Sequence, residues 1–200
     1  MTPARDMTDE SALVARSLRG DHEAFGRLVE RYADQVLNVA YRMVGNRAEA
    51  EDLTQDTFLA AFKALPRFRA ESKFSTWLYR IGVNKCKDWL KSKGHQVQEL
   101  DAEGEPINLA ERLPDFRTPD RTLEDKELGA LLEAAIATLP VWYRDAFVLK
   151  HIEGLDYEEI SDIVGVGRDT LKMRVYKARV HLRRMLADLV ESYPELRNLE

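Results

Sequence analysis

The chain has 200 residues, of which 44% are hydrophobic and 32% are charged, so it can build one or two small cores but not one large core. Its single cysteine, Cys86, excludes an internal disulfide and a zinc cluster made of several cysteines. The net charge is −5, but residues 1–94 carry 16 Lys and Arg against 13 Asp and Glu, whereas residues 95–126 carry 4 against 9.

The composition favours helices. Seven prolines and ten glycines are too few for a fold with frequent turns, and long stretches rich in Ala, Leu, Glu, Arg and Lys predict an all-α protein. A weak, short helix is expected near residues 9–19. From residue 25 to 43, apolar side chains recur at steps of three and four, which predicts a long helix with one buried face that Asp21 can cap.

Two further helices follow in the first part of the chain. Asn46 and Glu49 have the spacing of a capping box, which opens a second helix that Pro66 ends. Apolar positions then support a third long helix over about residues 74–93. We interpret residues 1–94 as the first domain.

The next segment has a different character. Residues 95–122 contain three prolines, one glycine and many acids without a sustained period, which predicts a flexible acidic linker. Beyond it, amphipathic helices are expected over 123–139 and from Pro140 to about His151. The second small helical domain is therefore predicted to span residues 123–200.

The second domain is predicted to end in a helix-turn-helix. Asp156 and Glu159 form another capping-box pattern, which opens a short helix that ends near Val164. Gly165 and Gly167 provide the small residues that a sharp corner needs before the final helix.

The final helix separates apolar from cationic side chains. Its apolar stripe consists of Leu171, Val175, Ala178, Leu182 and Leu186, and its cationic side of Arg168, Lys172, Arg179 and Arg183, flanked by Arg174 and Lys177. A helix of this kind lies in the major groove of DNA, with its first residues near base edges. The alternative is a solvated basic face that balances the acids of the preceding helix.

Basic residues are also concentrated in residues 65–93, which contain eight Lys and Arg residues but two acidic residues. Cations and exposed aromatic or polar pockets together are expected of a protein that binds single-stranded nucleic acid. Trp77 and Trp89 fall near the apolar side of the helix, so we interpret them as core residues rather than base platforms. Asn84 lies on the polar side, where its amide can pair with a base edge.

Asp52 and Asp56 share one helix face, with Gln55 beside them. Such a pair can hold a metal or perform acid and base chemistry, but no histidine or further carboxylate is suitably placed. A docking surface for a basic partner is the preferred interpretation. We find no nucleophile with a base, phosphate-cradling loop or ligand cluster, so we expect neither an enzyme nor a cofactor.

The order of these motifs resembles the extracytoplasmic-function sigma factors, the compact two-domain class of bacterial transcription initiation factors. The segments that carry the resemblance are "AFGRLVERYADQVLNVAYRMVGNRAEAEDLTQDTFLAAFKALPRF", "FRAESKFSTWLYRIGVNKCKDWL" and residues 127–187. They are similar, in that order, to the segment that docks on core RNA polymerase, the promoter-melting segment and the reader of the upstream promoter element.

The resemblance implies roles for individual residues. Asp52, Gln55 and Asp56 would grip the clamp helices of the polymerase largest subunit. The single-stranded −10 element would be bound by Arg69, Ser72, Lys73, Phe74, Asn84, Lys87 and Asp88. In the −35 element, Lys172, Met173 and Lys177 would face bases, and Arg168, Arg174 and Arg179 would lie nearer phosphates.

The resemblance also implies partners and a place in the cell. Core polymerase, double-stranded upstream DNA and single-stranded downstream DNA would bind, and an anti-sigma factor, free or membrane-bound, would hold the protein silent; no small-molecule substrate is expected. No stretch approaches the roughly 20 apolar residues that cross a bilayer, and no signal peptide is evident, so we expect a cytoplasmic protein.

Gly167 and Asp169 depart from the serine and glycine that are common in the family. A stand-alone repressor or activator, which would bind duplex DNA tightly without polymerase, is the competing hypothesis.

Overall fold

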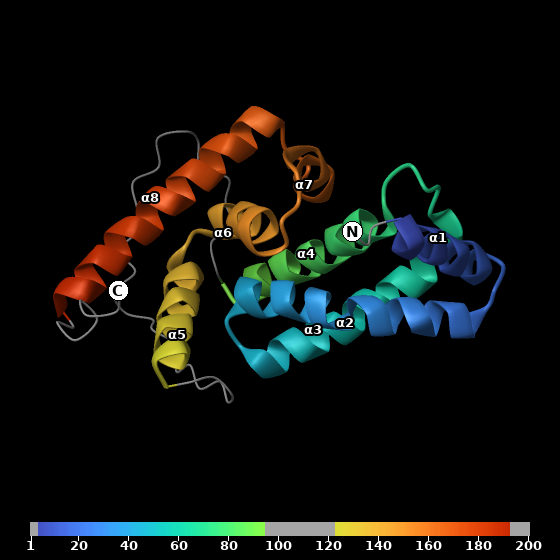
Figure 1. Cartoon of the computed structure of the whole chain (residues 1–200), viewed down its shortest axis with the longest axis horizontal. Coiled ribbons are helices and arrows are strands. Elements are labelled where there is room, and N and C mark those ends of the chain that lie inside the picture. The colour runs from blue at the N-terminus through green and yellow to red at the C-terminus, as the bar shows by residue number, and fades with distance from the viewer. Residues whose placement is uncertain (1–3, 95–122, 193–200) are drawn as a thin grey trace.

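The computed structural model describes residues 4–94 and 123–192, and within these two ranges every regular element is a helix. Residues 1–3, 95–122 and 193–200 are drawn as a thin grey trace in Figure 1 and lie outside the described residues. The predicted linker, residues 95–122, therefore falls outside them. The all-α fold class is confirmed.

Four α-helices form the N-terminal part. They are α1 (Ala4–Leu18), α2 (His22–Val44), α3 (Arg47–Ala64) and α4 (Phe74–Ser92), with a short 3-10 turn, η1 (Leu65–Arg67), after α3. Helix α1 begins earlier than the sequence pattern predicts. Asp21 caps α2 as predicted, because its side chain accepts a hydrogen bond from the backbone N–H of Ala24 at 3.0 Å. Gly45 ends α2 with a φ of 73°, a left-handed conformation that favours glycine.

Of the two hydrogen bonds that make up the predicted capping box of α3, the structure forms the one accepted by the Asn46 side chain. Asn46 accepts a hydrogen bond from the backbone N–H of Glu49 at 3.1 Å. The Glu49 carboxylate makes a different contact, since its Oε2 accepts a bond from Nε1 of Trp89 at 2.8 Å. This bond ties the end of α4 to the first turn of α3. Trp77 packs against Phe68 and Phe74, so both tryptophans belong to the packing of the domain.

Helices α2, α3 and α4 pack together around one apolar core. Its largest fully buried side chains include Leu28 and Met43 from α2 and Leu78 and Leu90 from α4. Burying such a side chain stabilises the fold by about 1.5–3 kcal/mol relative to leaving it in water. Gly82 lets α4 approach α3 closely, because a Cβ at this position would lie 3.4 Å from Cγ2 of Thr57.

The C-terminal part is also helical. It comprises α5 (Leu123–Thr138), α6 (Val141–Phe147) with a π-helical turn η2 (Val148–Ile152), α7 (Tyr157–Val164) and α8 (Arg168–Ser192). The helix expected to run from Pro140 to about His151 is therefore α6 continued by η2, with Pro140 at its N-cap. Pro140 suits that position, because it lacks the N–H that a helix start leaves unbonded.

The helix-turn-helix is built from α7 and α8. Asp156 accepts bonds from the backbone N–H groups of Glu158 and Glu159, both at 2.8 Å, and Glu159 Oε2 accepts one from the backbone N–H of Asp156 at 3.0 Å. The predicted capping box is thus complete.

The corner between α7 and α8 needs one glycine rather than two. Gly165 ends α7 with a φ of 77°, whereas Gly167 has no positive φ and a Cβ there would meet no atom within 4 Å. The hydroxyl of Ser161 donates a hydrogen bond to the carbonyl of Val166 at 2.7 Å and braces the turn. The expectation that the corner needs both glycines is therefore correct in part. The left-handed backbone conformation favours glycine at position 165, whereas position 167 has room for a larger residue.

The buried stripe of α8 is confirmed. Leu171, Val175, Ala178 and Leu182 are buried and share a core with Ile160 and Ile163 of α7, while Leu186 and Val164 are half-buried at its edge. The same four-and-three spacing leaves the cationic side of α8 facing outward.

The two helical parts are in direct contact. Helix α7 lies against α4, and α5 and α6 lie against α2 (Figure 1). Segments far apart in the sequence therefore share one surface.

Candidate nucleic-acid interface

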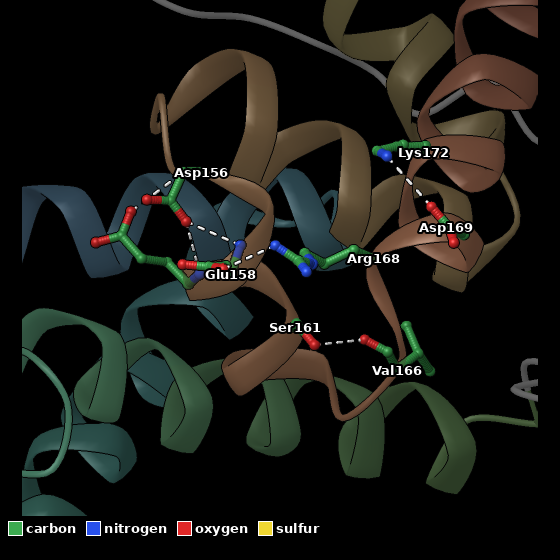
Figure 2. A network of polar contacts seen from close by, with 8 residues as sticks. Asp156, Glu158, Ser161, Val166, Arg168, Asp169 and Lys172 are labelled. Carbon is green, nitrogen blue, oxygen red and sulfur yellow. Dashed lines mark hydrogen bonds and ion pairs between the residues drawn. The ribbon is translucent and has the colours of Figure 1, made fainter.

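The first two turns of α8 expose the residues predicted to read duplex DNA. Arg168, Lys172 and Met173 are exposed, Met173 by 53%. Both cations have local acidic partners: Nη1 of Arg168 lies 2.8 Å from Oε1 of Glu158, and Nζ of Lys172 lies 3.2 Å from Oδ1 of Asp169 (Figure 2). Exposed pairs of this kind contribute little stability, so these cations can exchange their partners for groups on DNA.

The later cations of α8 lie in different environments. Arg179 is exposed, whereas Arg174 and Lys177 are half-buried. Burial raises the pKa of the Asp145 carboxyl, and Arg174 is close enough to oppose that shift, which places Arg174 partly toward the protein rather than fully toward a phosphate. Sequence reasoning missed Tyr176, which is 63% exposed three positions after Met173 and extends the outward apolar surface.

The loop before α4 borders a cavity of about 390 Å³. The lining residues are Arg67, Phe68, Arg69, Glu71, Ser72, Trp77 and Arg80, together with Asp162 of α7. Ala70, at the tip of this loop, has a φ of 54°, a conformation that residues with a side chain adopt at a cost. Arg69 and Ser72, two of the residues to which the family resemblance assigns the single-stranded −10 element, thus line this cavity.

Phe74 departs from its predicted DNA-facing position. It is 3% exposed and packs against Tyr32, Phe68 and Trp77 with ring centroids 5.6–5.9 Å apart. The reason is its place at the first residue of α4, where the buried face of that helix begins. Its position supports the shape of the loop from inside the core.

Helix α4 presents its predicted polar residues in two directions. Asn84 and Asp88, one turn apart, are exposed. Lys87 is half-buried, with Nζ 2.6 Å from Oδ2 of Asp145, and Nζ of Lys73 lies 2.8 Å from Oε1 of Glu159. The two cations are therefore turned toward acids of the C-terminal part.

The acidic face of α3 is exposed as predicted. Asp52, Gln55 and Asp56 lie together on the outside of the helix. Sequence reasoning missed that the same face continues into Leu59 and Phe62, which are 58% and 40% exposed. The sequence could have shown this, because Leu59 and Phe62 follow Asp52 by about two and three helical turns and so lie on the same side of α3. Among the described residues, no group of three or more His, Cys, Asp or Glu is placed to hold a metal ion.

Comparison with known proteins identifies the family. Residues 28–96 match Sigma-70 region 2, and residues 130–182 match Sigma-70, region 4. The RNA polymerase sigma-H factor of Pseudomonas aeruginosa is 34% identical over 184 residues, which cover 90% of this chain and 95% of that protein. The ECF RNA polymerase sigma factor SigW of Bacillus subtilis is 36% identical over 175 residues, which cover 86% and 93%. The chain belongs to the ECF family of RNA polymerase sigma factors.

Two solved structures share its fold. CnrH in complex with the cytosolic domain of CnrY aligns with a TM-score of 0.67 and 25% identity, over 90% of this chain and 98% of that one. RpoE from Bartonella quintana, in complex with the anti-sigma factor NepR, aligns with a TM-score of 0.61 and 25% identity, over 82% and 96%.

Membership of this family establishes the general function. As an ECF sigma factor, the chain is a transcription initiation factor that acts with RNA polymerase at promoters. In the ranges that the structure describes, none of the helices combines the length and apolar character of a membrane span.

Two charged residues of this sigma factor were missed entirely by sequence reasoning. Arg144 and Asp145 are 8% and 0% exposed. Burial lowers the pKa of Arg144 to about 10 and raises the pKa of Asp145, although Lys87 opposes the second shift. The available signal was an opposite-charge pair inside the otherwise apolar stretch "VWYRDAFVL".

Proposed function

We propose that this sigma factor divides promoter recognition between two domains, residues 1–94 and 123–200, joined by residues 95–122. The C-terminal domain reads the −35 duplex, the N-terminal domain binds the opened −10 strand, and α3 docks on core polymerase. The observation that supports this division best is the separation of charge. Cationic side chains gather on α8 and on α4 with its preceding loop, whereas the exposed face of α3 is acidic.

At the −35 element, α8 enters the major groove with its first turns. Lys172, Met173 and Lys177 face bases, and Arg168, Arg179 and the half-buried Arg174 bind phosphates. Arg168 must first leave Glu158, but an exposed pair is worth only about 0–1 kcal/mol, so a phosphate can replace the carboxylate. The exposed methionine offers an apolar contact of the kind that reads a thymine methyl group.

At the −10 element, the loop before α4, which forms the N-terminal side of the cavity, receives an unstacked base. Flipping a base costs about a few kcal/mol, which contacts in the pocket must offset. Arg69 and Ser72 line the cavity, and Asn84 and Asp88 offer amide and carboxylate groups to base edges along the exposed side of α4. Trapping the base shifts the equilibrium from closed to open promoter without covalent chemistry.

The face of α3 fits a partner that is basic and partly apolar. Asp52, Gln55 and Asp56 supply charge and hydrogen bonds, and Leu59 with Phe62 supplies apolar area at one end. We assign this face to the clamp helices of the polymerase largest subunit. Electrostatic complementarity of this kind selects the partner and speeds association.

The remaining assignments follow from this role. The sigma factor acts in the cytoplasm as a non-enzymatic subunit, and an anti-sigma factor restrains it there or at the inner membrane. The two structural relatives were solved with bound partners, CnrY and NepR, which supports this expectation.

In vitro transcription with core polymerase and a random promoter library tests the proposal. Selected promoters should share two separate sequence blocks, one for each domain. The double variant Asp52→Lys and Asp56→Lys should not form holoenzyme in gel filtration, because it reverses the charge of the docking face.

The matched control is Glu30→Lys with Asp34→Lys, which makes the same charge change on exposed positions of α2 and should assemble normally. Unchanged assembly of the α3 variant would contradict the docking role. Tight binding of the free chain to promoter duplex at physiological salt would instead favour a stand-alone regulator.

A further inference from the structure

The C-terminal domain covers one side of α4, which includes Lys73 and Lys87, two of the residues to which the family resemblance assigns the opened strand. Helix α7 packs against α4 (Figure 1). Three polar groups on α4 or at its N-cap meet carboxylates of the C-terminal domain. The contacts are Lys73 Nζ to Glu159 Oε1 at 2.8 Å, Tyr79 Oη to Glu153 Oε2 at 2.7 Å and Lys87 Nζ to Asp145 Oδ2 at 2.6 Å.

The Lys87–Asp145 pair makes this contact specific. Asp145 is fully buried, so its carboxylate has lost its water, and Lys87 is the partner at ion-pair distance. A buried charge without a partner is strongly destabilising, whereas a paired one favours the arrangement that provides the partner. Separation of the domains would remove Lys87 from Asp145.

Arg144 makes a second buried contact across the same interface. Its guanidinium donates to the carbonyl of Met43 in the last turn of α2, and to those of Ala137 and Leu139 at the end of α5. Both helix ends carry carbonyls without intrahelical partners and a partial negative charge. One cation therefore satisfies two helix C-termini, and it does so when the two domains are together.

Two carboxylates of the C-terminal domain pair with cations of α4 that a DNA phosphate could otherwise bind. Glu159 pairs with Lys73 and Asp145 pairs with Lys87, and Asp162 of α7 forms part of the wall of the cavity of about 390 Å³ beside the loop. We infer that the free sigma factor is held closed by this interface, and that its C-terminal domain then excludes the opened promoter strand from α4. The inference rests on the strand-binding role proposed above for α4.

A disulfide across the interface tests this. A Cβ atom at Gly45 would lie 4.0 Å from the Cβ of Ala137, within the range that disulfides span, and the left-handed φ of 73° at Gly45 makes a side chain there cost about 1 kcal/mol. The variant Gly45→Cys with Ala137→Cys should therefore oxidise within one chain and lock the closed form. Cys86 is buried and does not compete.

Locking should reduce initiation by more than about tenfold, because a covalent bond removes the open fraction that can bind the strand. The measurement is transcription by the reconstituted holoenzyme from a promoter selected in the library experiment. Reduction with dithiothreitol should restore activity, and each single-cysteine variant should be insensitive to oxidation. Full activity of the oxidised protein would overturn the inference. Failure of both the reduced variant and the wild type to initiate would instead reject the proposed function.

A footprint on the wild-type chain provides the second measurement. In the closed form, the amine of Lys87 should acetylate more slowly than that of Lys91, which is exposed on the same helix. Equal rates would overturn the inference.

A charge reversal distant from the proposed strand site provides the matched comparison. Nη2 of Arg42 lies 3.3 Å from Oε1 of Glu133 across the interface. Arg42→Glu should open the domains and raise the reactivity of Lys87, and the swap with Glu133→Arg should lower it again. Unchanged Lys87 reactivity in the single variant would count against a closed state held by these contacts.

Discussion

Nζ of Lys172 lies 3.2 Å from Oδ1 of Asp169, within the first two turns of α8. The carboxylate is 97% exposed, so the pair sits in water and adds little to stability. An acid in the first turn stabilises the helix through the helix dipole, but the same charge repels phosphates at the end of the helix that faces DNA. Helix stability and DNA affinity therefore place opposite demands on this position.

Replacement of Asp169 by Asn should strengthen promoter binding. The variant removes the repulsion of nearby phosphates and frees the amine of Lys172 for the base that we assigned to it, so we expect affinity to rise by several-fold and the salt dependence to steepen. Binding of the holoenzyme to promoter DNA at several salt concentrations measures both. Asp34→Asn, an equal charge change on α2, serves as the control. An affinity and a salt slope that both stay unchanged would show that Asp169 does not oppose DNA binding.

The two glycines at the corner of the helix-turn-helix should respond differently to alanine. Gly165→Ala should destabilise the protein by about 1–2 kcal/mol, because a side chain is strained at a φ of 77°. Gly167→Ala should be neutral or stabilise by up to about 1 kcal/mol, since the folded chain accommodates a Cβ there and the unfolded chain loses freedom. Urea unfolding followed by circular dichroism separates the two, and equal losses would contradict the assignment of the corner.

The cap of α7 should make stability depend on pH in the acidic range. The backbone N–H of Glu159, helped by that of Glu158, holds the pKa of Asp156 below its ordinary value of 3.8. A carboxyl whose pKa is lowered by folding contributes stability that is present above 3.8 and is lost as the pH falls through the folded value.

The variant Asp156→Asn isolates this effect, because the amide keeps an oxygen acceptor but does not titrate. Wild type should be more stable than the variant at neutral pH, and the difference should shrink as the pH falls below 3.8. Urea midpoints measured across this range provide the comparison. A difference that stays constant would mean that the charge of Asp156 does not support the cap.

Cys86 should be inert in the folded protein. Burial raises the pKa of its thiol from 9.0 to about 12, so about a thousandfold less thiolate is present than for a free cysteine. Iodoacetamide should therefore modify it very slowly at neutral pH and rapidly in denaturant. Fast modification of the native protein, followed by mass spectrometry, would show that the centre of the N-terminal core opens readily.

The features that were predicted correctly depend on residues close together in the chain. Asp21 and Asp156 cap their helices as expected, and the stripe of Leu171 to Leu182 is buried, because caps and helical faces are set within one to four turns. The acidic face of α3 was readable for the same reason.

The sequence alone determined the helices, their buried faces and the helix-turn-helix, since each depends on local spacing. Only the tertiary structure decided which charges meet between the N-terminal and the C-terminal helices. Arg144 reaches the carbonyl of Met43 from 101 positions away, and Lys87 meets Asp145, although no local pattern pairs these residues. Burial also moved Phe74 from the expected DNA face into the core. Such choices depend on which apolar surfaces pack together, and packing between distant helices is a property of the whole fold rather than of any segment.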